Sequence, residues 1–182
     1  MIYQFLTDED IIQQIKQDLL ENIIANETER QTKIRKAEAS VLKQIRSKAG
    51  KWYDLDTVLI SIKQWNTITN YLVGQYVYDE GVIYYALQDN TDLKPSANSL
   101  FWKSNDPRHE LLVMYAVDMV LYHLHSLVNP RKIPDLRKER YNEAKSWLEQ
   151  IADRNENADF PTNELDEELI IWGSNPKIQN YF

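Results

Sequence analysis

The chain has 182 residues, of which 43% are hydrophobic and 27% charged, an ordinary composition for a globular protein of one domain or slightly more. Its 21 basic and 28 acidic residues give a net charge of −7, which argues against a general DNA-binding protein, because DNA binding rests on phosphate neutralisation. The lack of cysteine excludes disulfide scaffolds and cysteine-ligated zinc, and only 4 glycines exclude glycine-rich phosphate loops.

Two helices are expected in the first 50 residues. Thr7 is a candidate N-cap with Asp10 three residues later, and apolar residues then recur at helical spacing over 11–23. Residues 26–49 predict a second, long helix that Gly50 ends in the left-handed conformation. The second helix is rich in Lys and Arg, which leaves two interpretations, a DNA-facing surface or a solvated or intersubunit face. We favour the solvated or intersubunit face.

The pattern changes between residues 57 and 104. Strand-like runs appear at 58–62, 71–78 and 82–87, and Asp79-Glu80-Gly81 has the composition of a hairpin turn. We therefore expect a small antiparallel β module inserted at 57–104 into a helical core formed by 1–56 and 105–152.

The second half of that core is predicted as two more helices. Asp106-Pro107 is a candidate cap and start for a helix that is apolar almost all round as far as Val128, which suits a protein core or a subunit interface. Another helix is expected from about Asp135 to Ala152. The result is a mainly α protein with four helices in its core.

Polar side chains within these helices predict structure rather than chemistry. Asp118 lies among apolar residues and needs a partner, for which Arg137 or Arg140 on the next helix is the natural candidate, so we expect a core or subunit-interface pair of Asp118 with Arg140. His123 and His125 are two residues apart on a helix and point in different directions. No nucleophile and base can be paired, so we expect neither an enzyme nor a metal or cofactor site.

Residues 153–182 are both acidic and apolar, which predicts an extended arm that needs a partner surface to bury it. No apolar run reaches membrane-spanning length and no signal-peptide pattern is present, so we expect no membrane partner. The candidate binding residues of the arm are Leu169, Ile170, Ile171, Trp172, Ile178, Tyr181 and Phe182.

The aromatic residues of the insert carry a first resemblance. The spacing from Trp65 through Tyr71, Gly74, Gly81 and Tyr84 to Trp102 resembles the small chitin- and cellulose-binding modules of bacterial glycosidases over about 40 residues. Flat aromatic rings can stack on sugars, but small modules also need large side chains for their core, and we favour the core. The residues concerned are Trp65, Tyr76, Tyr78, Tyr85 and Trp102.

The helical parts carry a second resemblance, to the head–tail connector (adaptor) proteins of Mu-like tailed phages. It rests on 3–10, on 35–41 leading to 53–55, and most strongly on 115–124 with Pro130 to Pro134, Arg140-Tyr141 and Trp147-Leu148. The stretch 172–177 is similar to the polar ends of that family. The β insert and the long acidic tail depart from the family's compact form.

The resemblance implies a structural virion protein made in the cytoplasm of a bacterial host and placed in the neck, between portal and tail. Copies would form a ring, a dodecamer, that binds the portal and further neck or tail proteins and continues the DNA channel. The C-terminal arm would bind the portal or a neighbouring subunit of the ring. A net-negative wall would let DNA slide through without sequence-specific binding. The alternative is a carbohydrate-binding virion or cell-surface protein that acts through the insert.

Overall fold

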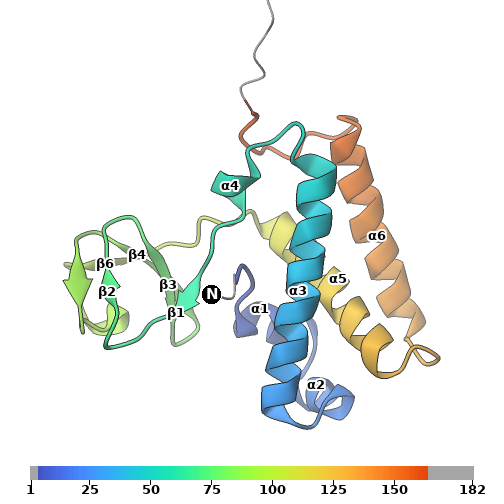
Figure 1. Ribbon diagram of the computed structural model, residues 1–182, viewed down its shortest axis with the longest axis horizontal. Helices are drawn as coiled ribbons and strands as arrows, with labels where there is room; N and C mark the ends of the chain where they lie inside the picture. The colour runs from blue at the N-terminus through green and yellow to red at the C-terminus, as the bar shows by residue number, and fades with distance from the viewer. Residues whose placement is uncertain (1–3, 164–182) are drawn as a thin grey trace, which may run out of the picture.

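A computed structural model describes residues 4–163, which form a helical body and a β module beside it (Figure 1). Within these residues there are six α-helices, six short strands and one 3-10 helix. The helices are α1 (Asp8–Gln14), α2 (Gln17–Ile23), α3 (Glu27–Ala49), α4 (Leu55–Val58), α5 (Glu110–Val128) and α6 (Asp135–Ala152).

The N-terminal helices follow the sequence only in part. The expected capping box of Thr7 and Asp10 is confirmed, with both of its hydrogen bonds formed. The expected single helix is wrong, because Ile15 adopts an extended backbone (φ −145°, ψ 131°) and separates α1 from α2. The long helix α3 is confirmed, but Gly50 has φ −66° and ends it in the right-handed region, so the expected left-handed cap is wrong.

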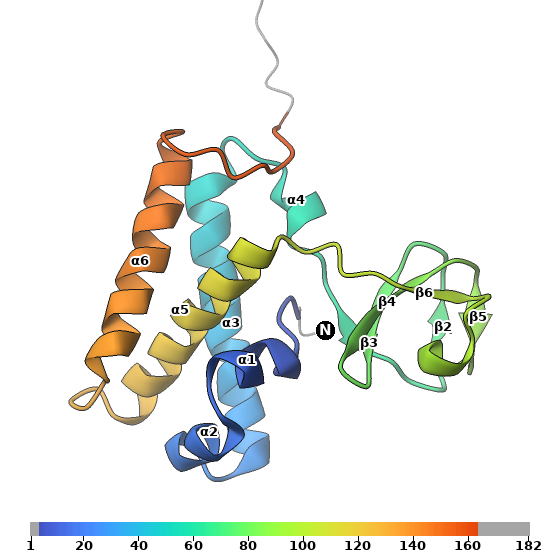
Figure 2. The ribbon, with the colours of Figure 1, turned by 180° about the vertical axis from the view of Figure 1, so that it is seen from behind.

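The body is built around α5, which contacts α1, α3 and α6 (Figure 2). Its N-cap is His109, so the expected start at Asp106-Pro107 is wrong. By length and mean hydropathy α5 is the one helix of the described chain that could span a membrane, yet 44% of that apolar window is buried inside this fold. Its buried apolar residues belong to the largest cluster of the protein, as expected for a core helix.

The β module holds two small sheets. One has the strand order β1-β3-β4-β6, and the other pairs β2 with β5. The predicted hairpin turn is confirmed, because Glu80 and Gly81 between β3 and β4 both have positive φ, at 47° and 84°. The elements are β1 (Lys63–Gln64), β2 (Asn70–Tyr71), β3 (Tyr76–Asp79), β4 (Val82–Ala86), β5 (Asn90–Thr91), the 3-10 helix Pro95–Ala97 and β6 (Trp102–Ser104).

The expected fold class, a four-helix connector-type core with an antiparallel insertion and an extended arm, is wrong. The described chain has six α-helices, because the break at Ile15 makes two helices of one and because Val58, expected in a strand, closes α4. The larger sheet is mixed, since β1 runs parallel to β3. Residues 164–182 of the expected arm lie outside the described chain.

Two separate hydrophobic cores underlie the body and the module. The body core includes Val58 and Leu59, so the module's own structure begins near Lys63 rather than at residue 57. The module core is small and consists of Tyr71, Val77, Ala86 and Trp102.

Candidate interaction sites

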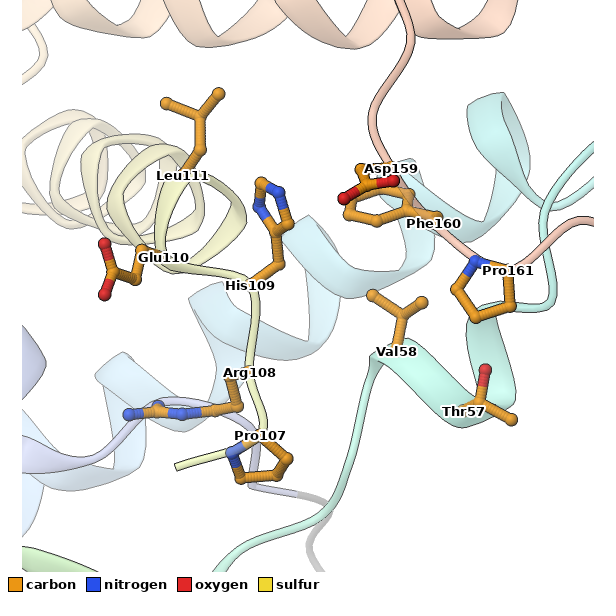
Figure 3. Close-up of a pocket in the computed structure, with 10 residues that line it drawn as sticks. All are labelled: Thr57, Val58, Pro107, Arg108, His109, Glu110, Leu111, Asp159, Phe160 and Pro161. Atoms are coloured by element: carbon orange, nitrogen blue, oxygen red, sulfur yellow. The ribbon is translucent and has the colours of Figure 1, made fainter. Parts of the chain in front are cut away.

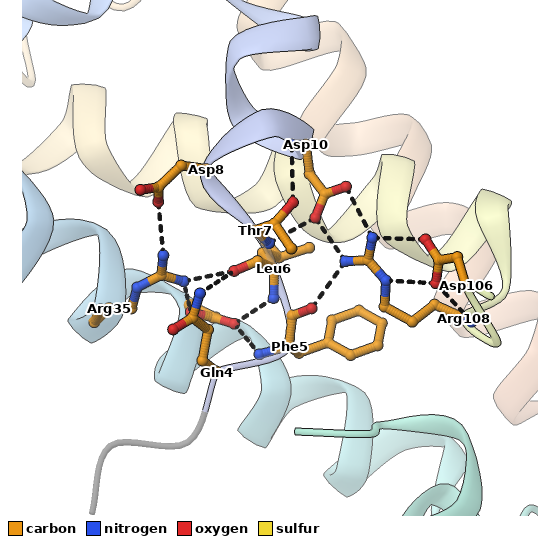
Figure 4. A network of polar contacts seen from close by, with 10 residues as sticks. Gln4, Phe5, Leu6, Thr7, Asp8, Asp10, Arg35, Asp106 and Arg108 are labelled. Atoms are coloured by element: carbon orange, nitrogen blue, oxygen red, sulfur yellow. Dashed lines mark hydrogen bonds and ion pairs between the residues drawn. The ribbon is translucent and has the colours of Figure 1, made fainter. Parts of the chain in front are cut away.

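The N-terminal segment is held against α3 by a buried carboxylate. Glu38 on α3 is 1% exposed, and its Oε1 accepts hydrogen bonds from the backbone N–H groups of Phe5 and Leu6 at 2.6 and 2.7 Å (Figure 4). Arg35, one turn earlier, pairs with the other oxygen of Glu38 at 2.7 Å and also donates to Leu6 O and to Asp8. A buried carboxylate with several donors is well compensated, so this arrangement anchors the chain.

Arg108 holds the other side of the same segment. Its guanidinium contacts Asp10 at 2.6 and 3.0 Å, Asp106 at 2.8 and 2.9 Å, and the carbonyl of Phe5 at 2.9 Å (Figure 4). Burial opposes the charge of this arginine, but the hydrogen bonds to Asp106 and Asp10 outweigh it and raise its pKa. We call Glu38, Arg35, Arg108, Asp10 and Asp106 the N-terminal clasp.

The clasp joins three distant parts of the chain at the point where the β module returns to the body. Asp10 also accepts from Thr7 N–H, so the capping box of α1 is part of it. Each guanidinium and carboxylate of the clasp already has protein partners, and the group therefore positions segments rather than awaiting a substrate.

A cavity of about 610 Å³ lies beside the start of α5 (Figure 3). His109 and Phe160 face each other there, with ring centroids 5.2 Å apart and nearly perpendicular planes. The guanidinium of Arg108 points away from them, toward the clasp (Figures 3 and 4).

Asp118 receives both of its sequence-predicted partners from α6. Arg137 Nη1 lies 2.9 Å from its Oδ1 and Arg140 Nη1 lies 3.7 Å away. Burial raises the pKa of Asp118, although the two arginines act in the opposite direction. The structure thus places Asp118 and Arg140 together, with Arg137 as the closer partner.

Aromatic rings also contribute to the contact between α5 and α6. Tyr122 stacks on Tyr141 with centroids 4.0 Å apart, and Tyr115 lies 4.9 Å from Trp147. His123 contacts Gln44 of α3 at 3.3 Å. Within the described residues no group of three or more His, Asp or Glu side chains is arranged to hold a metal ion.

The module's aromatic residues divide between core and surface. Trp102 is 2% exposed, and its indole N–H donates to Leu93 O, so it cannot form a stacking platform. Tyr76 and Tyr85 form a half-buried cross-strand pair with centroids 5.1 Å apart. Tyr78, on the same face, lies near Glu9 of α1, and burial together with the nearby acids raises its pKa to about 12.

The last of the five candidate aromatic residues, Trp65, is half-buried and packs against the module core, with its indole nitrogen left without a hydrogen-bond partner. The candidate residues of the arm, from Leu169 to Phe182, lie outside the described chain.

Sequence reasoning missed the clasp apart from Asp10, which it placed in the capping box of α1. Glu38 carried a signal, because it lies four residues from Ile34 and from Leu42 on the buried side of α3. Arg108 carried none, since its partner Asp10 is 98 positions away.

The comparisons with known proteins find no match, neither among protein-family models nor among curated proteins or solved structures.

Proposed function

We propose that the chain is a structural subunit of a tailed-phage neck, a head–tail connector whose copies form a ring between portal and tail. In this function it performs no chemistry, and DNA passes through the ring without sequence-specific binding. The proposal rests on the resemblance of its helical parts to Mu-like connector proteins and on how those parts pack.

One observation carries the proposal. Within the described residues, the stretches that resemble the connector family lie on both sides of the β module in sequence and pack into a single body. Arg35 and Glu38 of the second stretch bind the backbone of Phe5 and Leu6 in the first. The third stretch forms the contact of α5 with α6, including the stack of Tyr122 on Tyr141. The stretches that resemble one family thus belong to one folded body, which supports the interpretation of that body as a connector.

Light scattering on size-exclusion fractions tests the proposal, first on the protein alone and then with the portal protein from the same genome. We expect a large complex of fixed stoichiometry with the portal. The mixture is repeated with portal isolated from DNA-filled heads. A protein that stays monomeric alone and with either portal preparation would contradict the connector function.

A variant without the module sharpens this test. Residues 63–104 are replaced by a six-residue Gly/Ser linker, because the ends of β1 and β6 are three strand spacings apart, about 14 Å, and six residues span about 20 Å. Ile62, whose N–H donates to Gln4 O, and Arg108 both remain. A connector keeps its assembly with the portal in this variant.

The second candidate function is carbohydrate binding through the module. It is favoured by the Tyr76–Tyr85 pair, which presents two adjacent rings on one sheet face beside the exposed Lys103. Binding to insoluble chitin and cellulose, measured with the whole protein and with Tyr76→Ala/Tyr85→Ala, tests it. The sugar-binding function is favoured if the whole protein binds the polysaccharide and both this variant and the variant without the module do not.

A further inference from the structure

The turn between α5 and α6 exposes an unusual concentration of apolar side chains. Leu127 and Leu136 are each 60% exposed and Val128 is 40% exposed. Pro130 and Pro134 lie between them and are also exposed. Single exposed leucines are common, but several exposed apolar side chains in one connection between two helices indicate a contact surface. We call residues 127–136 the turn patch.

The turn patch is also basic. Arg131 and Lys132 are exposed, and within the described chain neither has a carboxylate within 4.0 Å. The acid closest in sequence, Asp135, is already paired with Lys138 at 2.8 Å. A complementary partner would therefore be acidic and apolar together.

The chain itself contains such a segment beyond the described residues. Residues 164–172 read Glu-Leu-Asp-Glu-Glu-Leu-Ile-Ile-Trp, with four acidic and five apolar residues. Charge and hydrophobicity thus match those of the turn patch, and the remaining question is which copy supplies the segment.

The backbone of residues 164–168 is too short to reach the turn patch of the same copy. The described chain ends at Asn163, which donates to Trp52 O and to Gly50 O, while the indole of Trp52 donates to Ala152 O at the end of α6. The turn patch lies at the opposite end of α6 (Figure 1). That helix has 18 residues and is about 27 Å long. Glu168, five residues beyond Asn163, reaches at most about 18 Å.

We propose that residues 164–172 of one copy dock on the turn patch of a second copy. The apolar residues Leu169, Ile170 and Ile171 cover Leu127 and Leu136, and the acids pair with Arg131 and Lys132. The two surfaces differ, so the contact is head-to-tail and repeats from copy to copy, which closes into a ring when the rotation permits. The inference names the partner surface for the ring of the proposed function and in that respect rests on it.

Disulfide trapping tests the contact, because the full chain has no cysteine of its own. Leu136→Cys and Ile170→Cys are placed in separate full-length copies, which are mixed under mild oxidation. We expect a linked dimer in at least about fivefold greater yield than when the Ile170→Cys copy is mixed with Leu100→Cys. Leu100 is a matched control, since it is 77% exposed and belongs to the module.

Charge reversal tests the second component of the contact. Adding Arg131→Glu/Lys132→Glu to the Leu136→Cys copy should lower the dimer yield about fivefold. Glu167→Lys/Glu168→Lys on the partner copy should restore it. All of these positions are exposed or outside the described chain, and unchanged helical circular dichroism verifies the fold.

Three results would overturn the inference. They are a dimer yield no greater than that of the Leu100→Cys control, a yield indifferent to charge reversal, and a preferred intrachain disulfide when both cysteines are in one copy. Failure of the proposed function has a different signature, because trapping succeeds while no portal complex forms. Conversely, if a portal complex forms but no disulfide-linked dimer does, only the docking of residues 164–172 on the turn patch is refuted.

Discussion

At the scale of single residues, the charged groups buried inside the body depend most on their partners for stability. The side chain of Arg108 is 3% exposed and that of Glu38 is 1% exposed, and each is surrounded by partners that compensate its charge. A buried ion pair adds little net stability over an apolar pair, but breaking one leaves a buried charge uncompensated. The loss of stability when one partner is substituted is therefore larger than the stability that the intact ion pair adds.

We predict that Arg108→Met destabilises the protein by about 3–5 kcal/mol, because Asp10 and the carbonyl of Phe5 lose their donor. The measurement is urea-induced unfolding followed by circular dichroism. Lys33→Met is the control, since the pair of Lys33 with Glu29 is partly exposed and its loss should change stability by less than about 1 kcal/mol. Equal effects from both variants would contradict a structural role for the clasp.

At the scale of elements, the long helices were predictable and the short elements were not. The bounds of α3 and α6 agree closely with the sequence pattern, because many apolar residues at helical spacing determine them together. The strands β1, β2 and β5 have two residues each, and so few residues carry no readable alternation. The parallel pairing of β1 with β3 depends on where the intervening chain returns, which local sequence does not encode.

The packing of α5 against α3 predicts how stability depends on pH. Burial lowers the pKa of His123, so the folded protein binds a proton less readily than the unfolded chain does, where the pKa is about 6.5. The resulting stability is fully present above about pH 6.5 and is lost as the pH falls through the folded-state pKa. His125 acts in the same direction, through its burial and the charge of Arg137.

We expect His123→Gln to reduce the loss of stability between pH 7 and pH 5. Glutamine cannot be protonated and can still bond to Gln44. The measurement is the midpoint of urea unfolding at the two pH values. A midpoint shift as large as that of the unsubstituted protein would show that His123 is not a source of the acid sensitivity.

At the scale of the whole molecule, body and module have cores that do not overlap. The module core rests on Trp102, whose ring lies 5.4 Å from that of Tyr71. The sequence predicted an inserted module and the Asp118 partners on α6, because both leave local signals in composition and charge. It could not predict the clasp, since a contact such as Arg108 with Asp10 appears only after folding.

We predict that Trp102→Ala unfolds the module and leaves the body folded. Replacing a buried tryptophan by alanine costs about 3–5 kcal/mol, a large share of what so small a core supplies. Near-ultraviolet circular dichroism should lose intensity while the helical signal at 222 nm and its unfolding midpoint persist. Leu100→Ala, at a 77% exposed position, is the control. A parallel loss of the helical signal would mean that the body depends on the module.

The clasp also determines the order in which a nascent chain can fold. Strand pairing within residues 63–104 is complete once β6 has left the ribosome, so the module can form first. The body must wait for Arg108 and for α5, because both contact residues near the N-terminus. At about 5–20 residues per second, synthesis of the 59 residues from Ala49, the end of α3, to Arg108 takes about 3–12 seconds. During that time the apolar face of α3 is accessible to chaperones. The inserted module is the first part of the protein that can bury its own core.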